Sequence, residues 1–209
     1  MSNTKKMTSK TLLLVETAML TAIILVMAFT HLGYIVIGPL SLTLLMVPVI
    51  VGGVNCGKGV GAFLGAVFGA TSFAQCFMGD VLGSFLISFS IPRTLFVCVV
   101  SRILAGFLCG LIFEVCEKHD SKKGWSYVVA SISGSLLNTV FFLGSLAILF
   151  WNTQFTAEQA TALGGLESVL KTAIAIASGI NAPIELLVCA VIASAVSKAL
   201  AVALKRVSK

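Results

Sequence analysis

Charged residues are scarce in this sequence. Asp, Glu, Lys and Arg make up 11% of its 209 residues, whereas hydrophobic residues make up 58%. A soluble domain carries roughly 25% charged residues, so too little polar surface remains here to cover a globule of this size in water. The composition excludes an ordinary soluble protein and predicts an all-α membrane protein embedded in the lipid bilayer.

The residues from which enzymes and metal centres are built are also few. The six cysteines are scattered without a CxxC pair, and the two histidines, His31 and His119, fall in different predicted loops. Asp80 and Asp120 are loop residues as well, whereas an intramembrane aspartyl protease needs two aspartates within its spans. The basic residues are dispersed and are not interleaved with aromatics. We therefore expect no catalysis, no metal ion, no cofactor and no nucleic-acid partner.

One segment imitates a phosphate-binding loop. The sequence GGVNCGKG, residues 52–59, contains the GxxxxGK pattern. The residue after the lysine should be Ser or Thr so that its hydroxyl can hold magnesium, and here it is Gly59. The segment also falls at a predicted membrane turn with no strand before it. We therefore expect the chain to lack an ATP-hydrolysing site of its own.

The positive charges follow a pattern along the chain. If the chain crosses a membrane six times, 11 of its 14 Lys and Arg residues fall on one side. Those 11 are Lys5, Lys6, Lys10, Lys58, Lys118, Lys122, Lys123, Lys198, Lys205, Arg206 and Lys209. Cytoplasmic segments are enriched in Lys and Arg, so the pattern predicts that both termini are cytoplasmic. Arg93, Arg102 and Lys171 are the exceptions.

The expected architecture is a bundle of six transmembrane helices that forms a single domain over residues 1–209. The expected spans are residues 10–30, 40–54, 59–73, 92–115, 125–151 and 181–204. The first span has about the 20 residues that a bilayer requires, and no convincing cleavage site follows it, so we expect it to be retained. Trp125 and Trp151 bracket the fifth span, and tryptophan prefers the membrane interfaces.

Small residues at intervals of four mark helix-packing faces in membranes. They are Gly57, Gly61, Gly65 and Gly69 in the third span, Gly106 and Gly110 in the fourth, and Ala130 and Gly134 in the fifth. We interpret these three sets as packing inside the bundle. Ala18 and Ala22 in the first span have the same spacing. For this pair two interpretations stay open, namely internal packing and a surface on which a partner helix docks.

Four polar residues lie within the last three spans. Arg102 is near the middle of the fourth, Asn138 is mid-way along the fifth, and Asn181 and Glu185 share one face of the sixth. Such groups are costly in a membrane and usually face the bundle interior, paired or in contact with a ligand. The cluster is either a structural Arg102–Glu185 ion pair with amide partners, or the lining of a small-molecule site in which Arg102 binds an anion. We favour the second interpretation.

Three residues nearer the outer surface complete the candidate substrate-binding set. Arg93, at the outer mouth of the fourth span, either recruits an anion or is a solvated interface charge. Tyr34 belongs to residues 31–39, a link that is unusually apolar for a loop and is either a lid over the bundle or an interfacial packing segment. Gln75 lies in the expected outer segment, residues 74–91.

Several strings together resemble a known family. They are AMLTA (residues 18–22), GYIVIGPLSLTLLMVPVIVGG (33–53), SRILAG (101–106) and NAPIE (181–185). With six spans and a cytoplasmic N-terminus, the chain resembles the substrate-binding S component of an energy-coupling factor (ECF) transporter. The resemblance covers nearly the whole chain and implies a bacterial plasma-membrane protein.

The resemblance implies a function and partners. S components bind a vitamin or related micronutrient on the extracellular side, between the outer halves of spans four to six and under outer loops that include the one after span one. The Ala18/Ala22 surface is similar to the one that meets coupling helices of a transmembrane scaffold (T) subunit, which a pair of cytoplasmic ATPases drives. The S component itself is implied to topple in the membrane and to catalyse nothing.

Within the family, the sequence most resembles the pantothenate-type subgroup. Arg102 would suit the carboxylate of pantothenate, and Asn138, Asn181 and Glu185 would suit its amide and hydroxyls. Riboflavin, folate and other vitamins stay open. Two alternatives from other classes also remain: a stand-alone secondary transporter or channel for a small organic solute, for which no clear pair of inverted repeats is found, and a membrane scaffold without a ligand.

Overall fold

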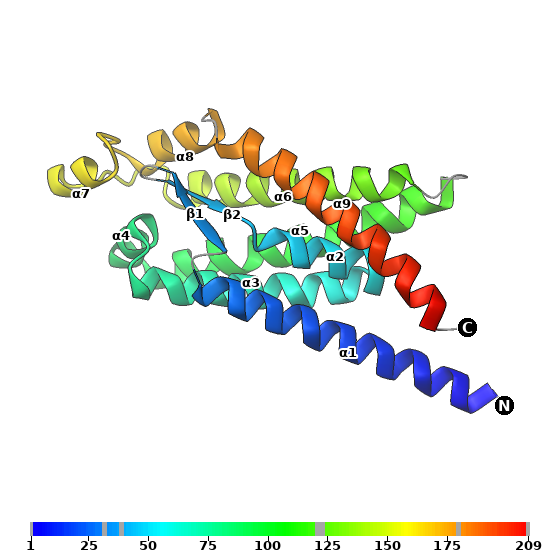
Figure 1. Ribbon diagram of the computed structural model, residues 1–209. Helices are drawn as coiled ribbons and strands as arrows, with labels where there is room; N and C mark the ends of the chain where they lie inside the picture. Colours follow the sequence, from blue (N-terminus) through cyan, green and yellow to red (C-terminus); the bar gives the residue numbers. More distant parts are fainter. Residues whose placement is uncertain (1, 31–32, 38–39, 120–123, 179–180, 208–209) are drawn as a thin grey trace.

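The structure is a computed structural model that describes residues 2–30, 33–37, 40–119, 124–178 and 181–207. The side chains of 2–9, 34–37, 40–42, 176–178, 181–182, 184–185 and 204–207 are outside the described set. Within these ranges the chain is a helical bundle with one small hairpin (Figure 1). Its elements are α1 (Ser2–Phe29), β1 (Tyr34–Ile37), β2 (Leu40–Thr43), α2 (Met46–Cys56), α3 (Lys58–Met78), α4 (Val81–Phe89), α5 (Ile91–His119), α6 (Trp125–Leu149), α7 (Ala157–Ala162), α8 (Val169–Ser178) and α9 (Asn181–Val207).

Five helices in the described part of the chain are long and apolar enough to cross a bilayer. Their apolar stretches are Lys10–Phe29, Lys58–Met78, Ile91–His119, Trp125–Leu149 and Leu186–Ala203. A span needs about 20 residues, because each helical residue rises about 1.5 Å and the hydrocarbon core is about 30 Å thick. These stretches confirm a helical, multi-pass membrane protein. The apolar helix α2 has 11 residues and is too short to span by itself.

The expected second span, residues 40–54, is wrong at its start. Residues 40–43 form the strand β2, and the helix α2 begins only at Met46. The two strands pair antiparallel, with Tyr34 opposite Thr43 and Ile37 opposite Leu40. β-branched residues favour such pairing. The pairing gives hydrogen bonds to backbone N–H and C=O groups that would otherwise be unsatisfied, which is costly in a membrane. The apolar link after α1 is therefore largely a hairpin.

The third and fourth expected spans are longer in the structure, and a short helix lies between them. Gly79 ends α3 in the left-handed conformation, with φ of 116°, which glycine adopts without strain. Asp80 then caps α4, since its carboxylate accepts a hydrogen bond from the backbone N–H of Gly83 at 2.7 Å. The expected outer segment, residues 74–91, is thus mainly helical.

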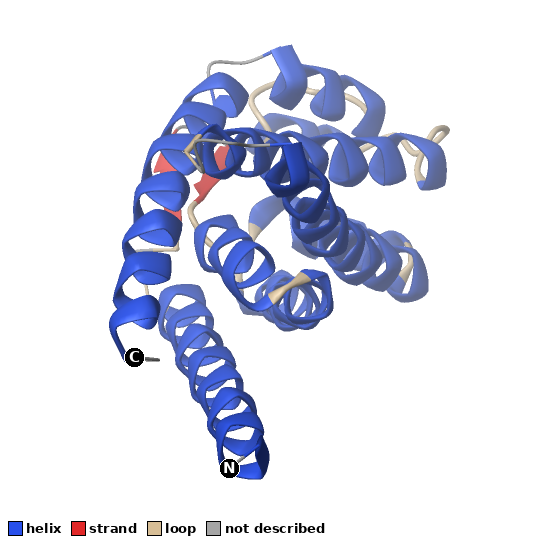
Figure 2. Ribbon diagram, turned by 90° about the vertical axis from the view of Figure 1, so that its right-hand side faces the viewer, coloured by secondary structure: helices blue, strands red, loops and turns tan. Residues whose placement is uncertain are grey.

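The N-terminal end of α1 and the C-terminal end of α9 lie at one end of the bundle, and α4, α7 and α8 lie at the other (Figure 1). Figure 2 views the molecule from the end that carries the termini and shows the hairpin strands among the helices. The short helix α2 packs against α1, α3, α5, α6 and α9. Its residues Met46, Val49 and Ile50 are fully buried, so α2 lies in the core of the bundle.

The glycine spacing in the third and fourth spans is confirmed as internal packing. A Cβ placed on Gly61, Gly65 or Gly69 of α3 would come within 2.5, 2.3 and 2.7 Å of carbonyl oxygens of α5. Those oxygens belong to Gly106, Arg102 and Cys98, respectively. Only glycine permits so close an approach of two backbones. Gly57 is outside this contact, because it turns between α2 and α3 with φ of 95° and open space around it.

The small-residue face of the fifth span is also confirmed as internal packing. Ala130 is fully buried in α6. A Cβ on Gly134 would come within 2.8 Å of the Cys109 sulfur and 2.9 Å of the side chain of Ile50. The helix α6 therefore presents a smooth surface to α5 and α2.

Candidate functional site

Arg102 and Asn138 are buried on neighbouring helices. Their side chains are 8% and 6% exposed, and α5, which carries Arg102, packs along α6, which carries Asn138. Phe142 lies one helical turn beyond Asn138 on the same face of α6. The guanidinium carbon of Arg102 is 4.4 Å from the centroid of the Phe142 ring. The structure thus brings two of the predicted polar residues into one region of the bundle interior.

Arg102 is held in place by its own helix and by two aromatic rings. Its Nη1 donates to the backbone carbonyl of Val97 at 3.0 Å and to the Ser101 hydroxyl at 3.2 Å. Its guanidinium also lies over the ring of Phe68 on α3, 5.2 Å from the centroid. Contacts of a desolvated cation with aromatic faces are stabilising. The charge is therefore fixed in orientation between α3 and α6.

Two polar atoms in this region are buried without a hydrogen-bond partner in the described part of the chain. They are Nε of Arg102, a donor, and Oδ1 of Asn138, an acceptor. An unsatisfied buried polar group costs about 1–3 kcal/mol, and more when it is charged. Native proteins leave few such groups without a functional reason. An anionic acceptor would pair Nε of Arg102, and an N–H or O–H donor would pair Oδ1 of Asn138.

Three other predicted site residues have side chains outside the described set. Asn181 is the first residue of α9 and Glu185 lies one turn further along, while Tyr34 begins β1. The helix α9 packs against α6. The predicted Arg102–Glu185 ion pair and the contribution of Tyr34 to a lid therefore stay predictions.

Gln75 and Arg93 join ends of neighbouring helices. The Gln75 side-chain amide donates to the backbone carbonyl of Ala28, near the end of α1. Arg93 is exposed, and its Nη1 donates to the carbonyl of Leu149 at the end of α6, at 3.4 Å. Both satisfy carbonyls near a helix C-terminus, where intrahelical partners are missing. Each residue is thus engaged in a contact that stabilises the bundle.

Sequence reasoning missed the aromatic residues beside Arg102. Phe142 follows Asn138 by four positions, which is the one signal in the sequence that could have placed it on the same face. Phe68 lies between Gly65 and Gly69, two of the glycines through which α3 contacts α5. This close contact places Phe68 next to Arg102.

Asp80 is a further acidic group whose charge interacts with Arg102. Desolvation by the surrounding protein raises the pKa of the Asp80 carboxyl, and the Gly83 N–H and the Arg102 charge oppose this rise. The residue lies between α3 and α4, at the end of the bundle opposite the chain termini (Figure 1). Among the described residues, no three or more His, Cys, Asp or Glu side chains gather in a way that could hold a metal ion.

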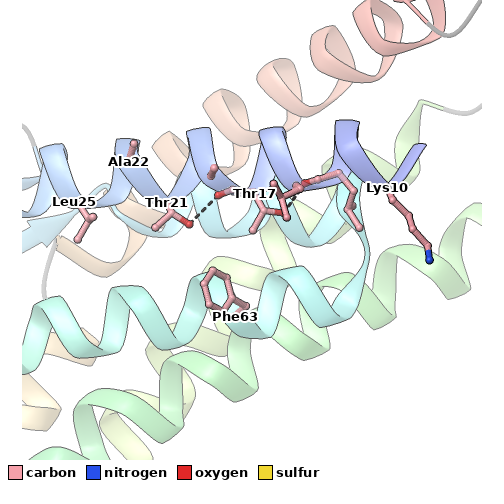
Figure 3. A pocket seen from close by; sticks show the side chains of 9 residues that line it. Lys10, Thr17, Thr21, Ala22, Leu25 and Phe63 are labelled. Atoms are coloured by element: carbon pink, nitrogen blue, oxygen red, sulfur yellow. Dashed lines mark hydrogen bonds between the residues drawn. The ribbon is translucent and has the colours of Figure 1, made fainter. Parts of the chain in front are cut away.

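An apolar groove runs along α1 beside Phe63 of α3 (Figure 3), and Ala18 and Ala22 are among its lining residues. The groove has a volume of about 570 Å³ and is lined by Lys10, Leu13, Leu14, Thr17, Ala18, Thr21, Ala22, Leu25 and Phe63. The hydroxyls of Thr17 and Thr21 each donate at 2.8 Å to a carbonyl of their own helix, which leaves the lining apolar. Both alanines are exposed, so they do not pack inside this chain.

The long apolar helices define a multi-pass membrane protein with buried polar residues in its interior. The family described as "ECF transporter, substrate-specific component" matches the sequence over residues 12–197. Because this match covers most of the chain, the protein belongs to that family, whose members are substrate-binding transport subunits and not enzymes. No curated protein matches the sequence.

Proposed function

We propose that this protein is the S component of an ECF-type importer and that it binds an anionic vitamin, with pantothenate as the best candidate. The observation that carries the proposal is the pair of unpartnered buried atoms, Nε of Arg102 and Oδ1 of Asn138. Burying such atoms in a membrane interior without hydrogen bonds costs free energy, and a ligand that pairs both atoms removes this cost.

The donor and acceptor set suits the groups of pantothenate. Its carboxylate would accept from the guanidinium of Arg102, whose planar donors match a carboxylate. Its amide N–H or one of its two hydroxyls would donate to Oδ1 of Asn138. The rings of Phe68 and Phe142 exclude water around the Arg102 charge, and an ionic contact is stronger in such surroundings. Asn181, Glu185 and Tyr34 would complete the site from α9 and the hairpin.

Six crossings are the best account of the topology. Both ends of the chain lie at one end of the bundle (Figure 1), which supports an even number of crossings. Five helices are long enough to span, so the sixth crossing falls to α2 together with the hairpin that precedes it. The excess of Lys and Arg at the end with the termini supports a cytoplasmic location for both, in a bacterial plasma membrane.

The groove on α1 is the proposed docking surface for the transmembrane scaffold subunit. The exposed Ala18 and Ala22 allow the backbone of another helix to approach closely. The GKG sequence at residues 57–59 lies at the turn between α2 and α3, without the preceding strand of a phosphate-binding loop. Energy for transport would therefore come from two ATPases that act through the scaffold.

A thermal-shift panel of vitamins on the purified protein in detergent tests the proposal. A ligand held at about 100 times its dissociation constant stabilises the folded state by roughly 2.7 kcal/mol. We expect pantothenate to raise the melting temperature, and we expect its alcohol analogue, in which CH2OH replaces the carboxylate, to raise it much less. Equal shifts with both compounds would show that the carboxylate is not recognised. No shift with any vitamin would contradict the proposed function.

A further inference from the structure

The apolar groove along α1 has a cation at one of its ends. Figure 3 shows Lys10 at that end and Leu25 at the other, with Phe63 of α3 facing the row of α1 side chains between them. Lys10 and Leu25 are 15 residues apart, which at about 1.5 Å of rise per residue gives a length of about 22 Å. One leaflet of the hydrocarbon core is about 15 Å thick. The groove is therefore long enough to reach from the headgroup region through one leaflet.

Small side chains among large ones make the groove hollow. Ala18 and Ala22 carry a single methyl group each, whereas Leu14, Leu25 and Phe63 beside them are large. The volume of about 570 Å³ lies within the range of roughly 300–1,000 Å³ that is typical of small-molecule pockets. All five side chains are exposed, so in a bilayer this hollow lies against lipid and an apolar chain fits it.

Lys10 is the one charged residue among the described residues that line the groove. The described part of the chain supplies no acidic partner for it within ion-pair distance. The hydroxyls of Thr17 and Thr21 already donate to carbonyls of their own helix. The polar chemistry that the groove offers to an occupant is thus a single ammonium group at one end, and ammonium groups of lysine bind phosphate as point charges.

The surroundings of Lys10 favour a negatively charged headgroup. The residue belongs to the N-terminal part of α1, which lies at the end of the bundle that carries both chain termini (Figure 1). Lys5 and Lys6 precede it in the sequence, and Lys205 and Arg206 stand near the other terminus. Clusters of Lys and Arg next to a membrane attract anionic lipids. Charge at this end therefore favours an anionic lipid over a zwitterionic one.

We propose that the groove binds one anionic phospholipid, with the phosphate at the ammonium group of Lys10 and one acyl chain along Ala18 and Ala22. The acyl chain fills the hollow, and the phosphate pairs the cation at its end. This lipid site depends neither on the vitamin nor on the scaffold subunit. One consequence does rest on the proposed function: the scaffold helix contacts the same two alanines, so the lipid leaves the groove when the scaffold docks.

The test compares two lipids on the purified full chain in detergent. Phosphatidylglycerol is anionic, and phosphatidylcholine with the same acyl chains is zwitterionic; each carries a photoreactive group in one acyl chain. After irradiation, mass spectrometry of the peptides locates and counts the adducts. We expect phosphatidylglycerol to label residues 10–25 and Phe63 roughly five-fold more than phosphatidylcholine, as the attraction of one lysine to anionic lipid predicts. Equal labelling by the two lipids, or labelling confined to other helices, would overturn the proposal.

Two exposed lysines provide a matched pair of variants. Lys10→Gln should lose the preference for phosphatidylglycerol and keep its labelling by phosphatidylcholine, whereas Lys198→Gln, on α9, should label like the wild type. An unchanged preference in Lys10→Gln would overturn the proposal.

Filling the hollow tests the place of the acyl chain. Ala18→Leu combined with Ala22→Leu should reduce the labelling of residues 10–25 by both lipids, and undiminished labelling there would contradict an acyl chain along the alanines. If this double variant fails to fold, the exposed substitution Lys10→Gln decides by itself. The assay contains neither vitamin nor scaffold, so its result is independent of whether the proposed function holds.

Discussion

The guanidinium of Arg102 lies 4.4 Å from the ring of Phe142, one turn beyond Asn138 on the neighbouring helix. This contact aligns α5 and α6 so that a buried cation and a buried amide lie in one region. It covers one face of the guanidinium but does not pair Nε, which has no hydrogen-bond partner among the described residues. Under the proposed function, this Nε is the donor that an anionic group of the ligand would pair.

Arg102→Ala should strongly weaken binding of a carboxylate ligand. A hydrogen bond to a charged group contributes about 1.5–3 kcal/mol, which corresponds to a loss of affinity of about ten- to a hundred-fold or more. Arg102→Lys should also weaken binding, because a lysine cannot offer planar paired donors. Ligand-induced thermal shifts measure this effect. Lys198→Ala, which removes an exposed cation from α9, is the control and should bind like the wild type. Equal behaviour of the Arg102 and Lys198 variants would exclude Arg102 from the site.

Asn138→Leu should separate ligand binding from stability. The substitution removes an acceptor that has no partner among the residues that the structure describes, and replacing an unsatisfied polar group by an apolar one of similar size costs little. We expect the unliganded variant to unfold within about 1 kcal/mol of the wild type, with its affinity for the ligand reduced. Thermal unfolding with and without ligand gives both quantities. A strongly destabilised variant that still binds normally would make Asn138 a structural residue.

Gly65→Ala should destabilise the bundle. The new methyl group would lie 2.3 Å from the Arg102 backbone oxygen, and this collision pushes α3 away from α5. Overpacking of this kind costs typically about 1–3 kcal/mol. The control is Gly144→Ala on α6, where a Cβ meets open space and where alanine favours the helix. Melting temperatures in detergent should fall for the first variant and stay level or rise for the second. A stable Gly65→Ala protein would contradict the close α3–α5 contact.

Asp80→Ala and Asp80→Asn should differ in stability. Alanine removes the cap of α4 and costs about 1 kcal/mol, whereas asparagine caps about as well as aspartate. Desolvation raises the pKa of the Asp80 carboxyl, so the folded state binds this proton more tightly than the unfolded state does. Stability contributed by Asp80 is therefore greater below its raised pKa and falls as the pH rises through it. Melting curves recorded across this pH range should show the melting temperature of the wild type falling as the pH rises. Asp80→Asn should lack this fall. An opposite slope would contradict the direction of the shift.

Ala18→Leu combined with Ala22→Leu should block docking and leave ligand binding intact. Two leucines would fill the groove that the exposed alanines line, and they would hold a partner helix away. Uptake by cells that express the whole transporter should be lost, while the purified variant should show the thermal shift of the wild type. Ala195→Leu, at an exposed position of α9, is the matched control and should transport normally. Transport by the double variant would show that this groove is not where the scaffold subunit docks.

The parts of the fold that the sequence predicted correctly follow from local patterns. Long apolar runs predicted the spanning helices, and glycines four residues apart predicted the α3–α5 contact, because both depend on helix geometry alone. The hairpin was missed because a short apolar run does not distinguish a strand from a helix. Its identity depends on the pairing of Tyr34–Ile37 with Leu40–Thr43, which is a tertiary property.

The site was predictable only in part, for a similar reason. Arg102 and Asn138 stand out as polar residues within apolar spans, and their burial agrees with that signal. Phe68 and Phe142 do not stand out, because phenylalanine is common on lipid-facing surfaces and only the rotation of each helix decides what it touches. The hydrogen bond from Gln75 to Ala28 depends on the contact between α1 and α3. No spacing of residues in the sequence indicates this hydrogen bond.

A structure of the protein with its vitamin bound is the most direct test of the central claim. The account predicts an anionic oxygen of the ligand within hydrogen-bond distance of Nε of Arg102 and an N–H or O–H group of the ligand at Oδ1 of Asn138. A ligand bound elsewhere, with those two atoms still unpaired, would contradict it.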